Sequence, residues 1–432
     1  MKNLSANRPL ALFMKIWHHV HTPQRNMVMG SHVSAPIFFV VMLNGISVRM
    51  KPKMKRVWAV LIWDVLTLMS VRRVSDDECE DAEVHLSDCH ALEQTFGGYT
   101  FFAPLAGDIA YLVDIDGKEV HRWQLPGRTG RHARILPNGN LAINTINPET
   151  PDIFPFIHKY GGGVMSELDP AGNVVRQVKD PLGHHDQFHY GNGGFLYTSL
   201  EALSKEDSAK VVGGIPGSEI DGATYADIIK EIDPEGKVTF EWKVSERLPR
   251  EEYALQPHYG REHYPLINSV LPLKDGNILC SMRSISAVLI IERATGNIIW
   301  SLKSDVIAQQ HCATELENGN ILIFDNGAYR TGESNTYSRV IEVDRKTKNT
   351  VWQYRDPSQW NTFFTQRLTN GNTLICESTF GRIFEVTVRG VLVWEYIVPH
   401  FAEYKDDITR GIFPGESNAL FRAYRYSKEE VP

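Results

Sequence analysis

Three observations predict that most of this chain is an all-β protein built from repeated hairpins. A phrase of the type Leu-x-Asn-Gly-Asn recurs between apolar runs, and a second phrase with its own turn alternates with it. Hydrophobic residues make up 42% of the 432 residues, and no long low-complexity tract interrupts the pattern. Such a chain can build a sizeable core from strands that pack face to face.

The first phrase is clearest at residues 316–323, which read Leu-Glu-Asn-Gly-Asn-Ile-Leu-Ile. An Asn-Gly or Asp-Gly pair between two apolar runs predicts a tight hairpin, in which both residues of the pair adopt positive φ. Copies of this phrase lie at residues 136–141, 190–196, 273–279, 316–323 and 368–374.

The second phrase begins at residues 109–123, where an apolar run, the pair Asp116-Gly117 and a terminal Trp123 follow one another. It also predicts a hairpin. The tryptophans that end several copies are expected in the core, because packed sheets need large wedges between them. Copies of this phrase lie at residues 109–123, 165–175, 228–242, 288–300, 340–352 and 383–396.

Alternation of the two hairpins predicts a six-bladed β-propeller of four-stranded blades over residues 96–432, with one hairpin of each kind in a blade. A first strand is expected within residues 99–104. A late strand within residues 418–426 is expected to close the ring, which removes exposed sheet edges. Residues 144–160 and 200–224 are expected to be long loops on one face, where loops tend to shape a pocket.

Residues 1–95 lack this pattern and are expected to form a partly helical or irregular extension. An apolar run at residues 57–69 follows a basic flank, as in an export signal or membrane anchor at about residues 50–71. An amphipathic helix is the alternative, because the run is short for a membrane span. A signal or anchor implies a periplasmic, secreted or membrane-anchored protein, and its absence a cytoplasmic one. A start at Met50 or Met54 would remove the preceding residues.

The charge balance argues against a nucleic-acid partner, because 45 basic residues face 52 acidic ones and the net charge is -7. Five cysteines are too few for a disulfide framework. Cys79 and Cys89 either pair in an oxidising compartment or remain free thiols. Cys280 and Cys376 are expected in the core, and Cys312 is expected to pack unless positive charge favours its thiolate.

Polar residues precede the first phrase in three consecutive blades, where inner strands should begin beside the central channel, and Arg283 follows the phrase in one of them. Arginine and imidazole groups that converge there would suit a sulfate or phosphate group. A solvated loop end is the alternative for the histidines and ion pairing is the alternative for the arginine. A metal is not expected, because no partner cluster has the spacing of a zinc site. The residues concerned are His184, His185, Asp186, His189, Asn268, Arg283, Gln310 and His311.

Over residues 97–426 the sequence resembles the arylsulfate sulfotransferases that need no nucleotide sulfate donor, a family of six-bladed propellers. The resemblance rests on the order of several phrases. These are His184-His185-Asp186, Asn268-Ser269, the phrase around Arg283, Gln310-His311, Asp325-Asn326-Gly327 and residues 421–426.

The resemblance implies a sulfuryl transferase that works by a ping-pong route without a cofactor. His311 would accept the sulfuryl group from a phenolic sulfate ester and pass it to a phenol. His185, Asn268 and Arg283 would hold the sulfate oxygens. The departing phenolate needs a proton, which His184, His185 or His189 would supply.

One position departs from the family, which usually has a histidine two residues before the Asn-Ser pair, where this chain has Leu266. His263 lies three residues earlier, and on a regular strand that odd spacing turns it to the opposite face unless the chain bends. Two other functions therefore stay open. One is a non-catalytic propeller that binds a ligand or a protein, and the other is an aryl sulfate hydrolase.

Overall fold

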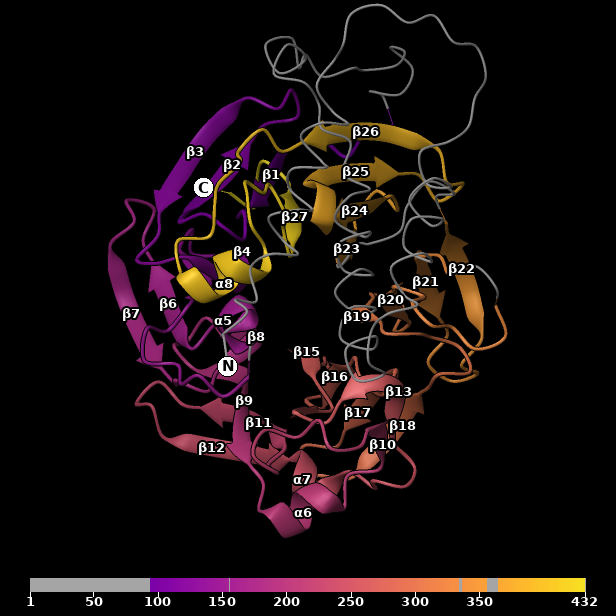
Figure 1. Cartoon of the computed structure of the whole chain (residues 1–432). Coiled ribbons are helices and arrows are strands. Elements are labelled where there is room, and N and C mark those ends of the chain that lie inside the picture. Colours follow the sequence, from indigo (N-terminus) through magenta and orange to yellow (C-terminus); the bar gives the residue numbers. More distant parts are fainter. Residues whose placement is uncertain (1–93, 155, 334–335, 356–363, 432) are drawn as a thin grey trace, which may run out of the picture. The chain divides into compact units, whose positions relative to one another are not determined.

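The computed structural model describes residues 94–154, 156–333, 336–355 and 364–431. Six four-stranded antiparallel sheets surround a common centre, which confirms the all-β, six-bladed propeller (Figure 1). The expected signal or anchor and the Cys79–Cys89 pair lie outside the described residues. In the part of the chain that is described, no helix has the length and apolar character needed to span a membrane.

The first three blades follow one another around the ring, and each is given from its inner to its outer strand. Blade one consists of β27 (Ala423–Tyr426), β1 (Tyr99–Phe102), β2 (Ile109–Val113) and β3 (Glu119–Gln124). Blade two consists of β4 (Thr129–Ile135), β5 (Leu141–Thr145), β6 (Val164–Leu168) and β7 (Val174–Lys179). Blade three consists of β8 (His184–His189), β9 (Phe195–Ala202), β11 (Tyr225–Ile232) and β12 (Val238–Lys243).

The last three blades repeat this order. Blade four consists of β15 (Ile267–Pro272), β16 (Ile278–Met282), β17 (Ala287–Ile291) and β18 (Ile298–Leu302). Blade five consists of β19 (His311–Glu315), β20 (Ile321–Asp325), β21 (Arg339–Val343) and β22 (Thr350–Tyr354). Blade six consists of β23 (Phe364–Arg367), β24 (Thr373–Glu377), β25 (Arg382–Val386) and β26 (Leu392–Ile397).

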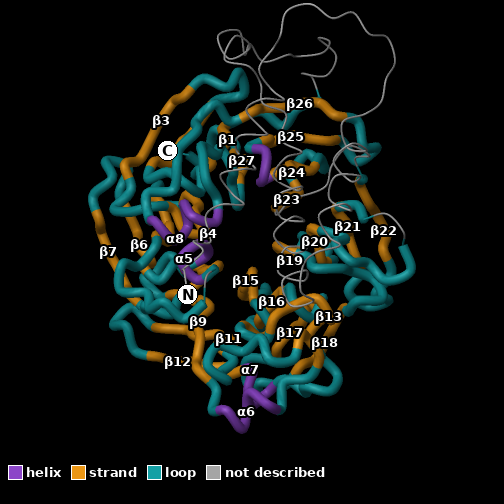
Figure 2. The backbone as a smooth tube through the Cα atoms, in the orientation of Figure 1, coloured by secondary structure: helices purple, strands orange, loops and turns teal. Residues whose placement is uncertain are grey.

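Short elements occupy the connections, as Figure 2 shows. The predicted long loops contain α5 (Ile157–Tyr160), α6 (Lys205–Ala209) and β10 (Gly213–Ile215), so they are more ordered than expected. The strand β13 (Leu255–Gly260) pairs with β10, and β14 (His263–Tyr264) adds a parallel partner to β11. The remaining helical elements are α7 (Val244–Arg247), α8 (Asp407–Ile412) and a 3₁₀ turn at Ser378–Phe380.

The ring closes through the C-terminal strand, as predicted. β27 pairs antiparallel with β1, and Phe101 is opposite Tyr424. The two strands come from opposite ends of the propeller sequence, which explains why the first phrase occurs only five times in six blades. Closure pairs the edge that β1 would otherwise expose.

The predicted hairpins are all present, but their turn differs from the expected one. At residues 316–320, Gly319 has φ 82°, whereas Asn318 is not among the residues with positive φ. The Leu316 amide donates to the Asn320 carbonyl at 2.8 Å, and the Gly319 amide donates back to the Leu316 carbonyl at 3.0 Å. This is a longer turn in which only the glycine is left-handed. The Asn318 side chain accepts from the Asn320 amide instead.

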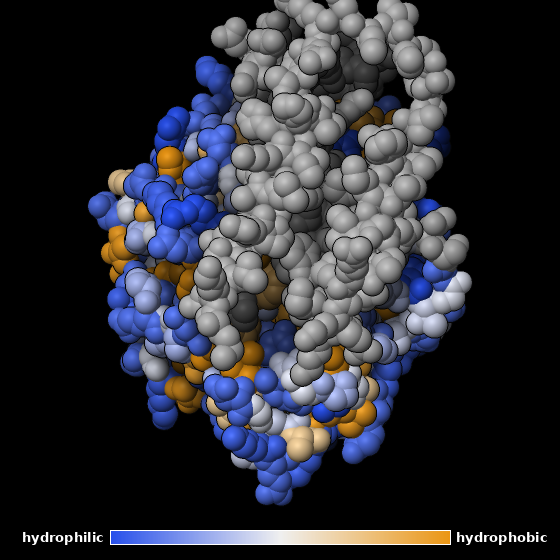
Figure 3. Space-filling view, in the orientation of Figure 1, coloured by the Kyte–Doolittle hydropathy of each residue, from blue (hydrophilic) through white to orange (hydrophobic). Residues whose placement is uncertain are grey.

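The hydrophobic core consists of clusters between neighbouring blades, to which the outer-strand tryptophans contribute. Trp123, Trp242 and Trp394 are buried, which confirms the prediction for these three. The Trp242 indole also donates at 2.8 Å to the carbonyl of Gly296 in the next blade. Trp394 makes the equivalent bond to Ile115 across the ring closure. On the face shown in Figure 3, hydrophilic residues cover much of the described surface.

Candidate active site

Inner strands of four consecutive blades break their ladders at the same place, near the start of each strand. Register shifts occur in β4 after Thr129, in β8 after His184, in β15 after Ile267 and in β19 after His311. Two residues inside these breaks, His185 and Cys312, both have φ 46°. Such bulges redirect side chains from the regular alternation of a strand.

The bulged positions correspond in sequence. Arg131, His185, Asn268 and His311 each lie five residues before the first residue of their Asn-Gly type turn. The Phe421 ring, which precedes β27, packs on three of them. It lies 5.1 Å from the Arg131 guanidinium, 6.3 Å from the His185 ring and 6.0 Å from the His311 ring. Three blades and the segment before β27 therefore supply one buried group of side chains, which consists of Arg131, His185, His311 and Phe421.

His311 is held in the state that a nucleophile requires. Its Nδ1 lies 2.7 Å from Oδ1 of Asn326. An amide oxygen only accepts, so Nδ1 carries the hydrogen and Nε2 keeps its lone pair. Burial lowers the pKa of His311 well below its usual value, and Arg283, Arg131 and Arg422 act in the same direction. The imidazole is therefore neutral at physiological pH.

Two guanidinium groups serve this site without a carboxylate partner. Among the residues that the structure describes, no Asp or Glu pairs with Arg131 or Arg283. Burial lowers the pKa of Arg131 to about 10, which still leaves it charged at neutral pH. Arg283 stands in the turn just after β16, and its guanidinium lies 5.4 Å from the Tyr259 ring. An oxyanion would supply the missing negative charge.

Asn268, predicted to hold sulfate oxygens, uses its amide to join two blades. Its Nδ2 donates to the Gln310 carbonyl at 2.8 Å, and its Oδ1 is buried without a partner. The Gln310 side chain donates back into blade four, to Ser281, Met282 and Ala287. These hydrogen bonds between blades four and five hold Gln310, the residue that precedes His311, in place.

A chain of buried polar groups stands behind His185. Nδ1 of His184 lies 2.8 Å from Nδ1 of His185, and Nε2 of His184 lies 2.8 Å from Oδ1 of Asp227. Nε2 of His263 approaches the same oxygen at 3.1 Å. Oδ2 of Asp227 accepts from the Ile267 amide at 3.0 Å. Burial opposes ionisation of Asp227, but His263 and His184 hold its pKa at about 2.

The chain bends between His263 and Asn268, so the expected strand parity fails there. Leu266 has φ 65°, and its carbonyl accepts from the Arg283 amide at 2.9 Å. His263 thereby joins the cluster of His184 and Asp227, and its ring lies 6.2 Å from that of Tyr160. An imidazole is thus present near the site, although the aligned position holds leucine.

His189 is not brought together with the other candidates. Its Nδ1 accepts from the Gly191 amide at 2.8 Å, and its Nε2 lies 2.9 Å from Glu167. Both nitrogens thus face residues outside the group around His311. The sequence analysis had grouped His189 with the residues expected to converge on one pocket, but the bulge in β8 separates its side chain from that of His185.

Aromatic rings accompany the cationic groups. Tyr160, the last residue of α5, lies with its ring centroid 4.5 Å from that of His185, and burial raises its pKa. Tyr259 donates its hydroxyl to Oε1 of Gln309 at 2.8 Å. Rings in this position could pack on the aryl group of a sulfate ester.

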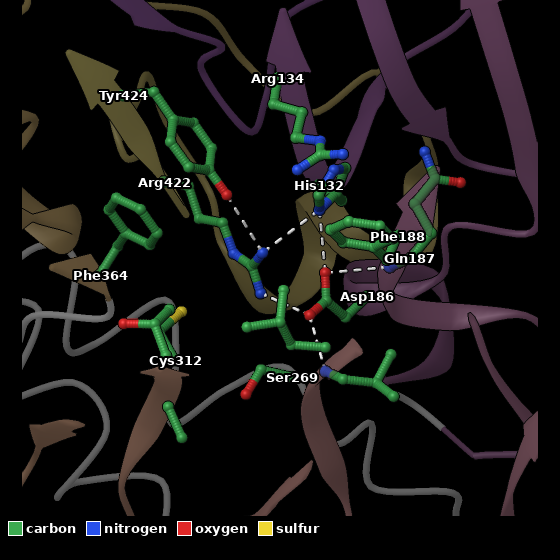
Figure 4. Close-up of a pocket in the computed structure, with 14 residues that line it drawn as sticks. His132, Arg134, Asp186, Gln187, Phe188, Ser269, Cys312, Phe364, Arg422 and Tyr424 are labelled. Carbon is green, nitrogen blue, oxygen red and sulfur yellow. Dashed lines mark hydrogen bonds and ion pairs between the residues drawn. The ribbon is translucent and has the colours of Figure 1, made fainter. Parts of the chain in front are cut away.

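A pocket lies beside this group, and Figure 4 shows it. On each of the four bulged inner strands, the residue that follows the bulged position lines this pocket. These residues are His132, Asp186, Ser269 and Cys312. Arg422 pairs with Asp186 at 2.8 Å, and His132 lies 2.9 Å from the same carboxylate. Burial raises the pKa of Cys312 to about 11, so its thiol stays protonated despite Arg422.

Whether the site holds a metal depends on His184, Asp227 and His263, whose donor atoms lie within 4.8 Å of one another. Nε2 of His263 makes a hydrogen bond to Asp227 at 3.1 Å, whereas Nε2 of His184 makes an ion-pair contact with the same oxygen at 2.8 Å. The three residues form the candidate cation cluster among those that the structure describes, although the sequence predicted no such cluster.

Fold and site together define a closed six-bladed propeller that gathers a neutral, buried histidine and cationic side chains beside its central channel. Comparison with known families identifies it further. The family model for arylsulfotransferase (ASST) matches residues 133–398, more than half of the chain. The protein belongs to the arylsulfotransferase family. Small-molecule substrates follow from that membership.

Other comparisons add little. No curated protein matches the sequence. A protein of unknown function from Bacteroides caccae is 13% identical, covers 69% of this chain and 93% of its own, and has a TM-score of 0.42. A streptogramin B lyase is also 13% identical, covers 72% of this chain and 85% of its own, and has a TM-score of 0.43. A virginiamycin B lyase from Staphylococcus aureus is 11% identical, covers 63% and 71%, and has a TM-score of 0.37. None of these likenesses bears on function.

The sequence reasoning missed Arg131 and Asp227. Arg131 occupies the same position relative to its turn as His185, Asn268 and His311, so comparison of all blades at that position would have found it. Asp227 lies within β11, whose sequence gives no sign of a polar site. Only its pairing with β14 and the bend at Leu266 bring it to the histidines.

Proposed function

We propose that the protein transfers a sulfuryl group from a phenolic sulfate ester to a phenol, with a sulfohistidine at His311 as the intermediate. The observation that carries the proposal is the neutral imidazole of His311 near Arg131 and Arg283, with which no Asp or Glu pairs in the part of the chain that the structure describes. Neutral imidazole is a competent nucleophile, and unneutralised cations attract and stabilise an oxyanion.

In the first half-reaction, Nε2 of His311 attacks the sulfur of the ester. A nitrogen–sulfur bond forms, the bond from sulfur to the aryl oxygen breaks, and the phenolate leaves with the electron pair of that bond. Oδ1 of Asn326 accepts a hydrogen bond from Nδ1–H of His311 and so supports the positive charge that develops on the ring. Arg131 and Arg283 stabilise the negative charge on the sulfuryl oxygens.

In the second half-reaction, the oxygen of a phenol attacks the sulfur, and its proton passes to the imidazole that protonated the first phenolate. The nitrogen–sulfur bond breaks, and its electron pair returns to Nε2 of His311. His311 returns to its neutral form. A proton donor for the first phenolate is needed near the site. Burial keeps His185 neutral, so His185 cannot serve, and we assign this role to His263. His263 would thereby replace the histidine that the family has at the position of Leu266.

The test measures 4-nitrophenolate release from 4-nitrophenyl sulfate with and without added phenol, in the absence of nucleotide. We expect release that depends on phenol and is lost in His311→Ala. A matched control is His121→Ala, which removes an imidazole on the outer strand of blade one. Release that persists in His311→Ala contradicts the proposal.

Two further results separate the alternatives. A modification of His311 by one SO₃ group after mixing with donor alone, found by mass spectrometry, supports the intermediate. Sulfate release without phenol at the same rate as transfer would instead identify a hydrolase. Binding of 4-nitrophenyl sulfate without turnover would identify a non-catalytic propeller.

A further inference from the structure

Three buried donor side chains meet behind His185, each on a different strand. His184 lies on β8, Asp227 on β11 and His263 on β14, and their donor atoms lie within 4.8 Å of one another. We propose that these three side chains bind a divalent transition-metal ion such as Zn²⁺, and that the bound ion inhibits sulfuryl transfer. The inhibition rests on the proposed function, whereas the binding of the ion does not.

The chemistry of the donors selects the class of ion. Two imidazole nitrogens and one carboxylate oxygen are ligands that Zn²⁺ and its neighbours in the first transition row accept, and zinc sites with three protein ligands leave a further position open. Ca²⁺ and Mg²⁺ prefer oxygen ligands. The cluster contains no sulfur, so it does not favour Cu⁺ or an iron–sulfur centre.

The distances within the cluster are close to those between ligands of one ion. Nε2 of His184 and Nε2 of His263 lie 2.8 and 3.1 Å from Oδ1 of Asp227. Two ligands that are about 2.1 Å from one ion, at an angle of roughly 90–110°, stand roughly 3.0–3.4 Å apart. Small movements of the side chains would therefore place all three donors around an ion.

One nitrogen of the cluster has no hydrogen bond to satisfy it. Nε2 of His263 bonds to Oδ1 of Asp227, but Nε2 of His184 is a buried atom without a hydrogen-bond partner among the described residues. Its distance of 2.8 Å to the same oxygen is short enough for a bond, so the direction of approach is what fails. A buried polar atom in this state is costly, and an ion beside Asp227 would satisfy it.

The carboxylate of Asp227 has no arginine or lysine partner. The residue is fully buried, and in the part of the chain that the structure describes its ion-pair contacts are with His184 and His263 alone. Removal of a carboxylate from water costs free energy unless a positive charge or a metal ion stands beside it. A divalent ion would supply that charge directly.

Neighbouring groups hold two of the ligands in place. Oδ2 of Asp227 accepts from the Ile267 amide at 3.0 Å, and Nδ1 of His184 lies 2.8 Å from Nδ1 of His185. Metal ligands usually have such outer partners, which fix the orientation of the ring or the carboxylate. The bulge in β8 and the left-handed Leu266 shape this region, so no regular spacing in the sequence indicates it.

The bound ion would act on transfer through His263. In the proposed reaction, His263 gives a proton to the first phenolate and later receives one from the phenol. A neutral imidazole has a single lone pair, which forms the bond to a metal ion, and a protonated imidazole must release its proton to solvent before it can bind. With the ion in place His263 has no lone pair for the proton of the phenol, so transfer stops until the ion leaves.

Binding is tested on the full-length protein after chelation has removed any metal. Zn²⁺ is titrated by calorimetry, and Co²⁺ serves as a visible probe, with long incubation because the ligands are buried. We expect the ion to bind and Co²⁺ to give the intense visible bands of a site with low coordination number. Absence of binding, or a Co²⁺ spectrum identical to that of the hydrated ion, would overturn the inference.

Variants assign the ion to the cluster. His184→Phe and His263→Phe each remove one ligand and keep the ring volume, and each should weaken Zn²⁺ binding by more than the roughly 10- to 100-fold that loss of an outer partner causes. The matched control is His189→Phe, because His189 and Glu167 form a histidine–carboxylate pair at 2.9 Å that belongs to no group of three donors in the described residues. This control should bind Zn²⁺ as the wild type does. Equal losses in all three variants would overturn the assignment.

X-ray absorption of the zinc-loaded wild type decides the case in which the ligand variants do not fold. Two imidazole nitrogens and oxygen ligands at about 2.0–2.2 Å support the site. Sulfur ligands, or oxygen ligands alone, would overturn it.

Turnover provides a readout of the inhibition. Occupation of the site by Zn²⁺ should lower phenol-dependent release of 4-nitrophenolate by about 10²- to 10⁴-fold, the usual contribution of a positioned acid–base group, and chelation should restore it. Release that is unchanged or faster with the ion bound would overturn the inhibition. Protein that binds the ion but never turns over the ester contradicts the proposed function alone. Protein that turns over the ester but binds no ion contradicts this inference alone.

Discussion

Asn268 in blade four donates its side-chain amide to the carbonyl of Gln310, the residue that precedes His311 in blade five, over 2.8 Å. The bond ties the position of His311, the proposed nucleophile, to the neighbouring blade. Asn268 therefore acts on the site through the backbone of the next strand, whether or not it also contacts substrate.

Removal of this hydrogen bond should lower the stability of the protein and also slow its turnover of substrate. Asn268→Ala leaves the buried Gln310 carbonyl without this donor, which costs about 1–3 kcal/mol. We expect a lower midpoint of urea unfolding and slower release of 4-nitrophenolate. A variant with reduced turnover but wild-type stability would show that Asn268 serves only to bind substrate.

The contact between Asn326 and His311 predicts a change in pH dependence. Burial and Arg283 lower the pKa of His311, so acidification within the physiological range should not protonate it in the wild type. Asn326→Asp places a carboxylate at Nδ1, which raises the pKa of His311. Activity of this variant should therefore fall as the pH falls. The measurement is the size of the initial burst of 4-nitrophenolate at each pH. Asn326→Leu, as control, should be slower without the new dependence.

Arg131 is predicted to contribute to catalysis, although the sequence reasoning did not select it. Arg131→Gln should lower kcat by about 10²- to 10³-fold, as expected when one donor to a developing negative charge is removed. Arg293→Gln provides the control, because Arg293 pairs with Glu231 away from His311. Equal effects of the two variants on kcat would argue against a role for Arg131.

His132 predicts how stability depends on pH. Burial is the main reason that its pKa falls to about 4, against about 6.5 in the unfolded chain. Between these values the unfolded state binds the proton more readily, so stability decreases as the pH falls from about 6.5 to 4. His132→Gln should flatten this part of the curve of unfolding free energy against pH. Identical slopes in both proteins would contradict the assignment.

Gly327 and Gly319 provide a matched pair for backbone strain. A Cβ on Gly327, at φ 71°, would lie 1.8 Å from the Tyr337 carbonyl oxygen, whereas a Cβ on Gly319, at φ 82°, meets nothing within 4 Å. Gly319→Ala should cost about 1–2 kcal/mol for its left-handed backbone. Gly327→Ala should cost clearly more in urea unfolding, because it adds the clash. Equal costs would show that residues 327 and 337 move apart freely.

Hairpin phrases predicted the fold because each blade needs the same two turns, and turn residues are chosen by local backbone geometry. The same regularity predicted where His185, Asn268 and His311 lie, at the start of inner strands. It failed for His263, because the alternation of a strand assumes a regular backbone and Leu266 is left-handed. Asp227 depends on the pairing of β14 with β11, a contact between segments that no local pattern records.

The pairing of β27 with β1 also has a consequence for biosynthesis. Phe421, which packs on Arg131, His185 and His311, lies two residues before the closing strand β27. During translation every blade but the first can acquire its four strands before residues 421–426 leave the ribosome. His311 and its cationic neighbours therefore gain their aromatic cover and a closed ring in the same late event, so the site is not finished until the last strand is made.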